Sequence, residues 1–236
     1  MLENAGARMN TDDIAAECHT VVVPNSPYLN ENRIARINAG RYEGEEIRGA
    51  LHVTGSDDRV LEMGAGLGVV GAICAKNQKP QKVVSFEANP ALLPHINALY
   101  EMNALQDRIT VRNAVVLAEP DCPETVTFHV QSSYLGSSLL MKADRRTTQI
   151  DVPTVPFEQI RQDLSPTVLL CDIEGGELAF LEHADLSGIR AVVIEFHPEA
   201  YGVAGMRKCK DILRSAGFVK DDSLSSRTVW TCTRDL

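Results

Sequence analysis

The chain lacks the features that would tie it to a nucleic acid or to a membrane. Its basic residues form no run longer than a pair such as Arg145–Arg146, and 32 acidic against 23 basic residues give a formal net charge of -9. Domains that bind nucleic acids usually carry a basic stripe, so this charge disfavours a nucleic-acid substrate and favours a small or neutral one. No run approaches the roughly 20 apolar residues of a membrane span. We therefore expect neither a nucleic-acid nor a membrane partner.

Paired cysteines and a targeting segment are also missing. The six cysteines never form a Cys-x-x-Cys motif, and Cys74 and Cys171 lie in apolar segments. This is typical of free buried thiols in a reducing compartment. Residues 1–8 lack the apolar core of a signal peptide. We expect a cytoplasmic protein whose 236 residues suit one α/β domain with a short extension, and we leave a homodimer open.

A regular alternation of strands and helices begins at residue 59. Apolar runs predict five successive strands at residues 59–63, 82–87, 109–113, 167–172 and 190–196. Helical spacing follows most of them, and Asn89 with Pro90 predicts a helix cap followed by a proline at the first helical position. Such alternation is typical of a parallel sheet covered on both faces. The segments 218–220 and 228–232 predict an antiparallel pair near the C-terminus.

Two stretches depart from this alternation. Residues 1–52 are interpreted as an N-terminal extension or helical cap, with a short extended piece at 21–23 and two short helices after residue 31. Residues 53–236 form the main domain, with an insertion at about 119–159. Within the insertion we expect a hairpin-like pair of strands, 125–130 and 149–155, around a serine-rich turn at 132–138.

A glycine-rich turn follows the first strand of the main domain. Gly64, Gly66 and Gly68 let the backbone turn sharply and approach a ligand without an intervening Cβ. The helix that starts after the turn directs free N–H groups at whatever lies above it. This predicts a nucleotide-type ligand. A dinucleotide fingerprint needs a small third residue, but Val69 stands in that place.

The turn resembles motif I of the class I S-adenosylmethionine (SAM) methyltransferases, because Glu62 precedes the three glycines. More specifically, the chain resembles the FkbM-type family of methyltransferases. The likeness is carried by the motifs at residues 60–68, 86–90, 172–177 and 193–197. It extends over roughly residues 40–232, and many members carry Asp where this chain has Glu62, a change that keeps the charge.

The resemblance implies a Rossmann-like, seven-stranded class I methyltransferase sheet, mostly parallel with an antiparallel strand near the C-terminus and helices on both faces. It also implies that SAM is the cofactor, with its methionine part along the glycine turn. Glu87 would bind the ribose diol, because a carboxylate accepts two hydrogen bonds at once. The expected cofactor-binding residues are Glu62, Gly64, Ala65, Gly66, Gly68, Glu87, Ala88, Asn113 and Asp172. A purely structural role stays open for Glu62, as does a turn role for Asn113.

The activity that the resemblance implies is O-methylation of a hydroxyl on a small molecule, such as a sugar or a natural product. The sulfonium already activates the methyl group, so positioning matters most, but an alcohol must still lose its proton. The catalytic candidates are Asp172, His197 and Glu174, and we favour Asp172 as the base or orienting group. Glu174 and Glu177 have an alternative role as acids at a helix start, and His197 as a strand-end histidine. A divalent cation held by these acids is an alternative that we do not favour, and no metal ligand is assigned.

Three other functions remain open. An N-methyltransferase on protein or RNA is disfavoured by the absence of an Asn-Pro-Pro-Tyr-type motif after the fourth strand. An NAD(P)-dependent oxidoreductase is disfavoured by Val69 and by the lack of a Tyr-x-x-x-Lys pair. A non-catalytic SAM-binding protein is the third. Upstream, Tyr42–Glu43 matches a pair often found in the FkbM-type family, which implies a segment folded over the cofactor; a surface loop is the alternative.

Overall fold

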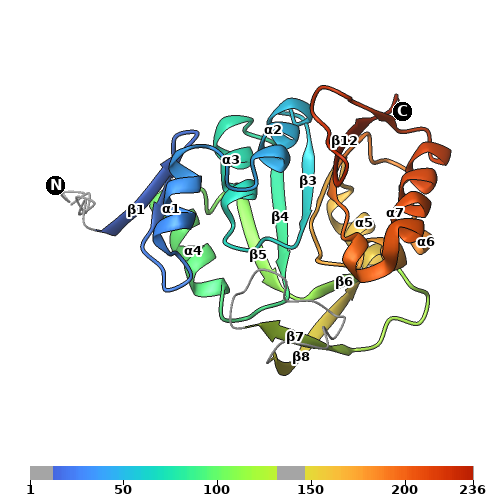
Figure 1. The fold of residues 1–236 in the computed structure, drawn as a ribbon, viewed down its shortest axis with the longest axis horizontal. Helices are drawn as coiled ribbons and strands as arrows, with labels where there is room; N and C mark the ends of the chain where they lie inside the picture. Colours follow the sequence, from blue (N-terminus) through green and yellow to red (C-terminus); the bar gives the residue numbers. More distant parts are fainter. Residues whose placement is uncertain (1–12, 132–146, 236) are drawn as a thin grey trace.

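A seven-stranded sheet forms the centre of the molecule (Figure 1). The computed structural model describes residues 13–131 and 147–235. The strand order is β11-β12-β10-β9-β3-β4-β5. The strands are β3 (Arg59–Met63), β4 (Lys82–Glu87), β5 (Ile109–Asn113), β9 (Val168–Cys171), β10 (Ala191–Glu195), β11 (Val219–Lys220) and β12 (Val229–Thr233). The first five are parallel, whereas β12 runs antiparallel to both β10 and β11. The predicted Rossmann-like, mostly parallel sheet is confirmed.

Helices cover both faces of this sheet, as expected. The described helices are α1 (Glu31–Asn38), α2 (Gly44–Val53), α3 (Val69–Asn77), α4 (Leu93–Met102), α5 (Phe157–Leu164), α6 (Glu177–His183) and α7 (Pro198–Ser215). Alternate side chains of a strand point to opposite faces. Val60 accordingly joins the core under α1 to α4, while its neighbour Leu61 joins the core under α5 to α7. Within the described residues, no helix combines the length and apolar character needed to cross a membrane.

The N-terminal segment packs against the same face as α3 and α4. The two short helices expected after residue 31 are present as α1 and α2. The extended piece at 21–23 lies in β2 (Val21–Pro24), which pairs with β1 (Ile14–Cys18), a strand that was not predicted. Val21 and Val23 of β2 are buried, so the hairpin is anchored to the main core.

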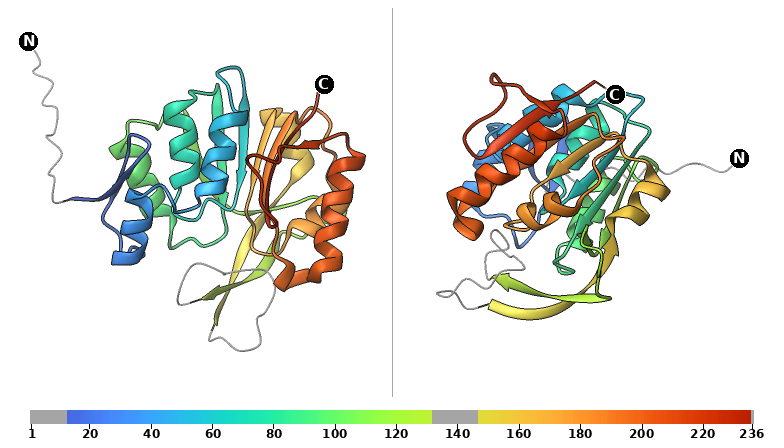
Figure 2. Two further views of the ribbon diagram at one scale, coloured as in Figure 1. Left: turned by 45° about the horizontal axis from the view of Figure 1, so that its top comes forward. Right: turned by 90° about the vertical axis from the view of Figure 1, so that its right-hand side faces the viewer.

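The insertion, together with β6 just before it, forms a second, three-stranded sheet in the order β6-β8-β7. Its strands are β6 (Val115–Leu117), β7 (Thr125–Gln131) and β8 (Thr147–Pro156), and both views of Figure 2 show β7 and β8 projecting from the main sheet. The antiparallel pairing of β7 with β8 agrees with the predicted hairpin. The parallel pairing of β8 with β6 was not predicted, because β6 is only three residues long. The serine-rich turn at 132–138 lies outside the described residues.

The predicted helix cap at Asn89 is wrong. Helix α4 begins only at Leu93, with Leu92 as its N-cap residue. Asn89 is buried, and its side-chain oxygen accepts a hydrogen bond from the Ala91 N–H at 3.1 Å. Its own N–H donates to Glu87. Asn89 therefore opens a tight turn at the end of β4 instead of capping a helix.

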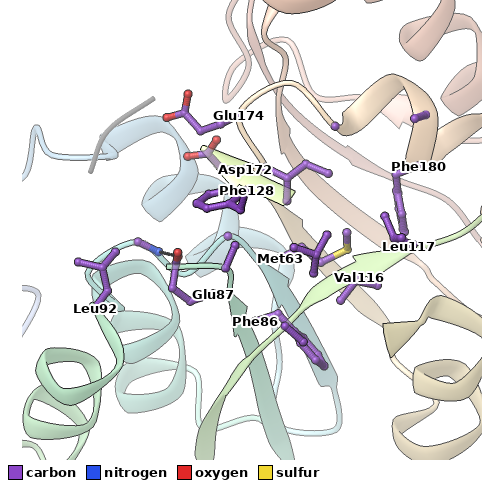
Figure 3. Close-up of a pocket in the computed structure, with 18 of the residues that line it drawn as sticks. Met63, Phe86, Glu87, Leu92, Val116, Leu117, Phe128, Asp172, Glu174 and Phe180 are labelled. Carbon is purple, nitrogen blue, oxygen red and sulfur yellow. Dashed lines mark hydrogen bonds between the residues drawn. The ribbon is translucent and has the colours of Figure 1, made fainter. Parts of the chain in front are cut away.

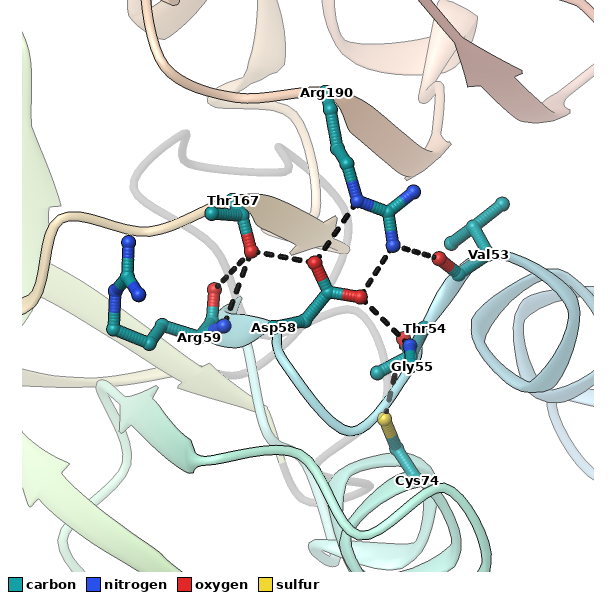
Figure 4. A network of polar contacts seen from close by, with 8 residues as sticks. All are labelled: Val53, Thr54, Gly55, Asp58, Arg59, Cys74, Thr167 and Arg190. Atoms are coloured by element: carbon teal, nitrogen blue, oxygen red, sulfur yellow. Dashed lines mark hydrogen bonds and ion pairs between the residues drawn. The ribbon is translucent and has the colours of Figure 1, made fainter.

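A polar network joins the opposite, amino ends of the strands (Figure 4). Asp58 is only 4% exposed and accepts hydrogen bonds from Arg190, from the Thr167 hydroxyl and from the Gly55 N–H. Arg190 also donates to the Val53 carbonyl at the end of α2. Burial alone would raise the pKa of Asp58, but these hydrogen bonds lower it below its usual value. The network ties β3, β9 and β10 together at the edge away from the glycine turn.

Candidate functional site

A cavity lies at the carboxyl ends of β3, β4 and β9. This is the edge of a doubly wound sheet where ligands bind. The cavity has an empty volume of about 970 Å³, part of it open to solvent. Figure 3 shows Glu87 and Leu92 on one side of it, Leu117 and Phe180 on the other, and Asp172 above. The lining is otherwise largely apolar, with Met63, Phe86, Ala114, Val115, Val116, Phe128 and Ile173 among its residues.

The glycine turn is fixed between β4 and β9. The N–H groups of Gly64 and Ala65 donate to the Phe86 carbonyl at 2.9 and 3.0 Å. A Cβ on Gly64 would stand 1.7 Å from the Asp172 carbonyl oxygen, and its φ of +84° lies in the left-handed region. Gly66 is different, since only the Glu43 Oε1 atom comes within 4 Å of its ideal Cβ. The turn therefore offers a bare stretch of backbone to the cavity.

Glu87 holds this turn in place from the end of β4. Its Oε2 accepts a hydrogen bond from the Gly66 N–H at 2.8 Å, and its Oε1 accepts one from the Asn89 N–H at 2.7 Å. Each oxygen keeps a second lone pair for a ligand hydroxyl. Burial raises the pKa of Glu87 to about 7, although the backbone N–H groups oppose this rise. Glu87 and Ala88 both line the cavity, where the sequence places them.

Glu62 points away from the cavity, toward α3. It is 2% exposed and accepts a hydrogen bond from Ser85. A Cβ on Gly71 would stand 2.3 Å from its Oε2, so the first turn of α3 rests directly on this carboxylate. Gly68, the N-cap residue of α3, likewise leaves no room for a side chain, because its ideal Cβ would stand 2.8 Å from the Ile96 side chain. These contacts match the structural role left open for Glu62.

Asn113 also holds the cavity wall and does not line it. Its side-chain amide donates to the Glu87 and Ala88 carbonyls at 2.8 and 3.0 Å. The residues that line the cavity here follow it in the chain, from Ala114 to Leu117. The amide thus positions the segment that carries Glu87, a tie between two strand ends that is neither a contact with the cavity nor a turn role.

The three catalytic candidates meet at the other side of the glycine turn. The Nε2 atom of His197 lies 3.6 Å from Asp172 Oδ1 and 3.7 Å from Glu174 Oε2. His197 is the N-cap residue of α7, two residues after the end of β10. Asp172 Oδ1 is buried and has no hydrogen-bond partner among the described residues. Asp172 and Glu174 line the cavity, so this cluster faces the ligand.

Glu177 orients His197 from behind, a role that the sequence interpretation missed. Its side chain is fully buried, and its Oε1 lies 3.0 Å from His197 Nδ1. The same oxygen accepts hydrogen bonds from the N–H groups of Gly175 and Ile173 at 3.0 and 3.3 Å. A carboxylate on Nδ1 directs Nε2 toward the cavity, as in other sites where a histidine moves a proton. The only sequence signal was its place in the 172–177 motif.

The surroundings of the cluster raise the pKa values of both His197 and Asp172. Burial alone would lower the pKa of His197, but its hydrogen bond with Glu177 and the nearby carboxylates outweigh burial and raise this pKa to about 10. Burial raises the pKa of Asp172 well above its usual value, and Glu174 adds to the rise. Asp172, Glu177 and His197 also offer ligand atoms within 4.8 Å of one another, a spacing compatible with the metal alternative.

A smaller cavity with an empty volume of about 340 Å³ lies on the α2 side of Asp172. Glu43 lines both cavities, and Glu46 and Glu62 line the smaller one. Glu195 interacts with both Glu46 and Asp172, and burial raises the pKa of Glu195 to about 8. Glu43 of the Tyr42–Glu43 pair therefore lies beside the glycine turn.

The sequence profile described as "Methyltransferase FkbM domain" matches residues 63–220, about two thirds of the chain. No curated protein matches the chain significantly. Precorrin-6y C5,15-methyltransferase from Geobacter metallireducens GS-15 has a similar structure, with a TM-score of 0.49 and 12% identity over 83% of this chain and 89% of that chain. The ribosomal protein L11 methylase from Lactobacillus delbrueckii subsp. bulgaricus gives a TM-score of 0.48 and 12% identity over 82% and 78%. The Streptococcus pneumoniae protein Sp1610, a putative tRNA (m1A22) methyltransferase in complex with SAM, gives 0.45 and 11% over 80% and 70%.

Proposed function

Because the chain belongs to the methyltransferase FkbM domain family, a family of SAM-dependent methyltransferases, we propose that it transfers a methyl group from SAM to a hydroxyl of a small molecule. One observation carries this proposal. A single cavity is bounded by the bare backbone of the glycine turn and Glu87 at one side, and by the Asp172–Glu174 side of the His197 cluster at the other. A cofactor subsite and a proton acceptor thus face the same space.

The residues present fit SAM. Gly66 lines the cavity and only Glu43 Oε1 comes within 4 Å of its ideal Cβ, so an extended ligand can lie against the turn backbone there. Glu87 keeps lone pairs for a ribose diol. The apolar walls at Leu92 and Ala114 suit a nucleobase. Bound SAM supplies a methyl group that its sulfonium already activates toward a nucleophile.

Asp172 and His197 are the groups that take the hydroxyl proton. Asp172 would accept the proton of the acceptor hydroxyl as bound SAM would supply its methyl group to that oxygen, and His197 Nε2, 3.6 Å from Asp172 Oδ1, would share this proton. In the free protein, burial raises the pKa of Asp172, while the hydrogen bond with Glu177 outweighs burial and raises the pKa of His197. A positive charge in the cavity that Asp172 lines lowers the proton affinity of both, because like charges repel. The base form is therefore favoured once the cofactor is bound.

The charge of the chain supports a small-molecule acceptor. The formal net charge is -9, and the described residues that line the two cavities include no lysine or arginine. A phosphate backbone would meet repulsion here.

Buried free thiols support a cytoplasmic location, since five of the six cysteines, all within the described residues, are buried and none forms a disulfide.

Product analysis tests this function. The protein is incubated with SAM carrying a ¹³C-labelled methyl group and with separate pools of sugars, polyketide-like alcohols, amines and RNA. We expect an O-methyl carbon resonance from a hydroxyl pool. With that acceptor, Asp172→Asn should lower kcat about 10²-fold or more, the usual contribution of a positioned base. Glu182→Gln, on the exposed side of α6, should leave kcat unchanged. Label only in the amine or RNA pool would contradict O-methylation.

A further inference from the structure

Glu43 has a backbone conformation that glycine normally adopts. Its φ of 45° and ψ of 41° lie in the left-handed region, at the residue before α2. For a residue with a Cβ this conformation costs about 1–2 kcal/mol. Such strain persists where the surrounding structure dictates it, often at ligand sites. The result is that the carboxylate reaches the glycine turn, with Oε1 3.9 Å from the ideal Cβ position of Gly66.

The charged groups that act most strongly on Glu43 are acids. Glu46 approaches from its own helix, Glu62 from β3, Glu195 from β10 and Asp172 from the end of β9. Tyr42 donates a hydrogen bond to the carboxylate. The described residues that line either cavity offer no lysine or arginine. A carboxylate in this position is stabilised most by a cation that a ligand brings.

We propose that Glu43 binds the positively charged methionyl part of SAM, namely its sulfonium and α-ammonium groups. This rests on the proposed SAM site of the preceding section. Glu87 accepts a hydrogen bond from the Gly66 N–H, and Glu43 Oε1 lies 3.9 Å from the ideal Cβ of the same glycine, so the two carboxylates flank one residue of the turn. In this proposal Glu87, at the end of β4, binds the neutral ribose diol, and Glu43, before α2, binds the cationic chain. S-adenosylhomocysteine, which has lost the sulfonium charge, is held less tightly by Glu43, so product release is favoured.

Proton release accompanies this binding. Burial, with the neighbouring acids adding to it, raises the pKa of Glu43 to about 8. A protonated Glu43 must lose its proton before it can pair with a cation, so the affinity for SAM falls as the pH drops below about 8. Burial also raises the pKa values of Glu62, Glu87 and Glu195 into the same range, so these acids can contribute to the pH dependence of SAM binding. The contribution of Glu43 is the part of this pH dependence that is lost in Glu43→Gln.

Calorimetric titration with three probes tests the proposal. They are SAM, S-adenosylhomocysteine and 5′-methylthioadenosine, which carries neither the sulfonium nor the amino-acid group. We expect Glu43→Gln to weaken SAM binding about tenfold or more, the share of one charge-assisted hydrogen bond, and S-adenosylhomocysteine binding by less. Binding of 5′-methylthioadenosine should be unchanged. Glu45→Gln, two residues along the same segment and with its side chain absent from both cavity linings, should change no affinity more than about twofold.

A second variant separates binding from folding. Glu43→Gly relieves the left-handed strain, so its midpoint of thermal unfolding should stay level or rise while SAM affinity falls as in Glu43→Gln. Wild-type affinity for SAM in either variant would overturn the proposal. So would an equal loss for all three probes. If the wild-type protein fails to bind SAM at all, the proposed function fails before this inference is reached.

Discussion

Single residues set the chemistry of this site through hydrogen bonds made behind the cavity. Glu177 joins three groups at once, the N–H groups of Gly175 and Ile173 and the imidazole of His197. A fully buried carboxylate that is so engaged costs desolvation energy, which its hydrogen bonds must offset. Because Glu177 Oε1 forms a hydrogen bond with His197 Nδ1, the other ring nitrogen, Nε2, faces Asp172. The position of Glu177 thus determines which atom of His197 meets the ligand.

Removal of the Glu177 charge should release the proton that His197 holds. In Glu177→Gln we expect the pKa of His197 to fall from about 10 by about one unit or more. In the wild-type protein, this raised pKa stabilises the fold at every pH below about 6.5, and the stabilisation is lost as the pH rises through about 10. As the pH rises from about 6.5 to about 10, the free energy of unfolding of the variant should therefore change less than that of the wild-type protein.

Imidazole ¹⁵N NMR titration measures this change directly. Glu182→Gln is the matched control, because Glu182 lies on the same helix but pairs with the exposed Lys208. It should leave the His197 titration where it is. An unchanged His197 pKa in Glu177→Gln would show that Glu177 does not hold the ring.

The residue types of the site could be predicted from the sequence, but their directions could not. Glu62 precedes the glycines and looks like a cofactor ligand, yet its strand position turns it toward α3. Glu177 looks like an acid that favours a helix start, yet it reaches a histidine 20 residues away in the chain. Which neighbour a side chain meets depends on strand register and on the path of loops, and neither is encoded in local spacing.

At the scale of elements, the glycine turn works because two strands leave no room for a side chain. Gly64 lies against the Asp172 backbone and donates to the Phe86 carbonyl, so the ends of β9 and β4 fix the turn from both sides. Element positions of this kind follow well from the sequence: β3, β4 and β5 begin and end where their apolar runs predict. The start of α4 does not, because buried hydrogen bonds take Asn89 away from the helix.

Gly64→Ala should be far more damaging than an ordinary glycine substitution. The added Cβ would meet a backbone oxygen that cannot move without displacing β9. Gly188 has the same φ of +84° and nothing within 4 Å of its ideal Cβ, so Gly188→Ala is a matched control that pays only the conformational cost of about 1–2 kcal/mol. We expect urea denaturation to show a larger loss for Gly64→Ala, together with loss of SAM binding. Equal losses of stability and binding in the two variants would contradict this account of the turn.

At the scale of the whole molecule, the buried polar network and the candidate site lie at opposite ends of the strands. The Asp58–Arg190 network joins the amino ends of the strands, while the cavity occupies their carboxyl ends. The parallel order and the helices on both faces followed from the alternation in the sequence. The second sheet did not, because its short strand β6 pairs in parallel with β8, almost 40 residues later. Such long-range pairing leaves little local trace.

Calorimetric titration of the wild-type protein with SAM and with NAD tests the central claim most directly. Proteins that bind either ligand use a glycine turn and an acid at the end of the second strand, which are Gly64 and Glu87 in this chain. These two features alone therefore do not distinguish SAM from NAD. The account predicts saturable binding of SAM and no detectable binding of NAD, and it predicts that Glu87→Gln weakens SAM binding. Binding of NAD without SAM would contradict it.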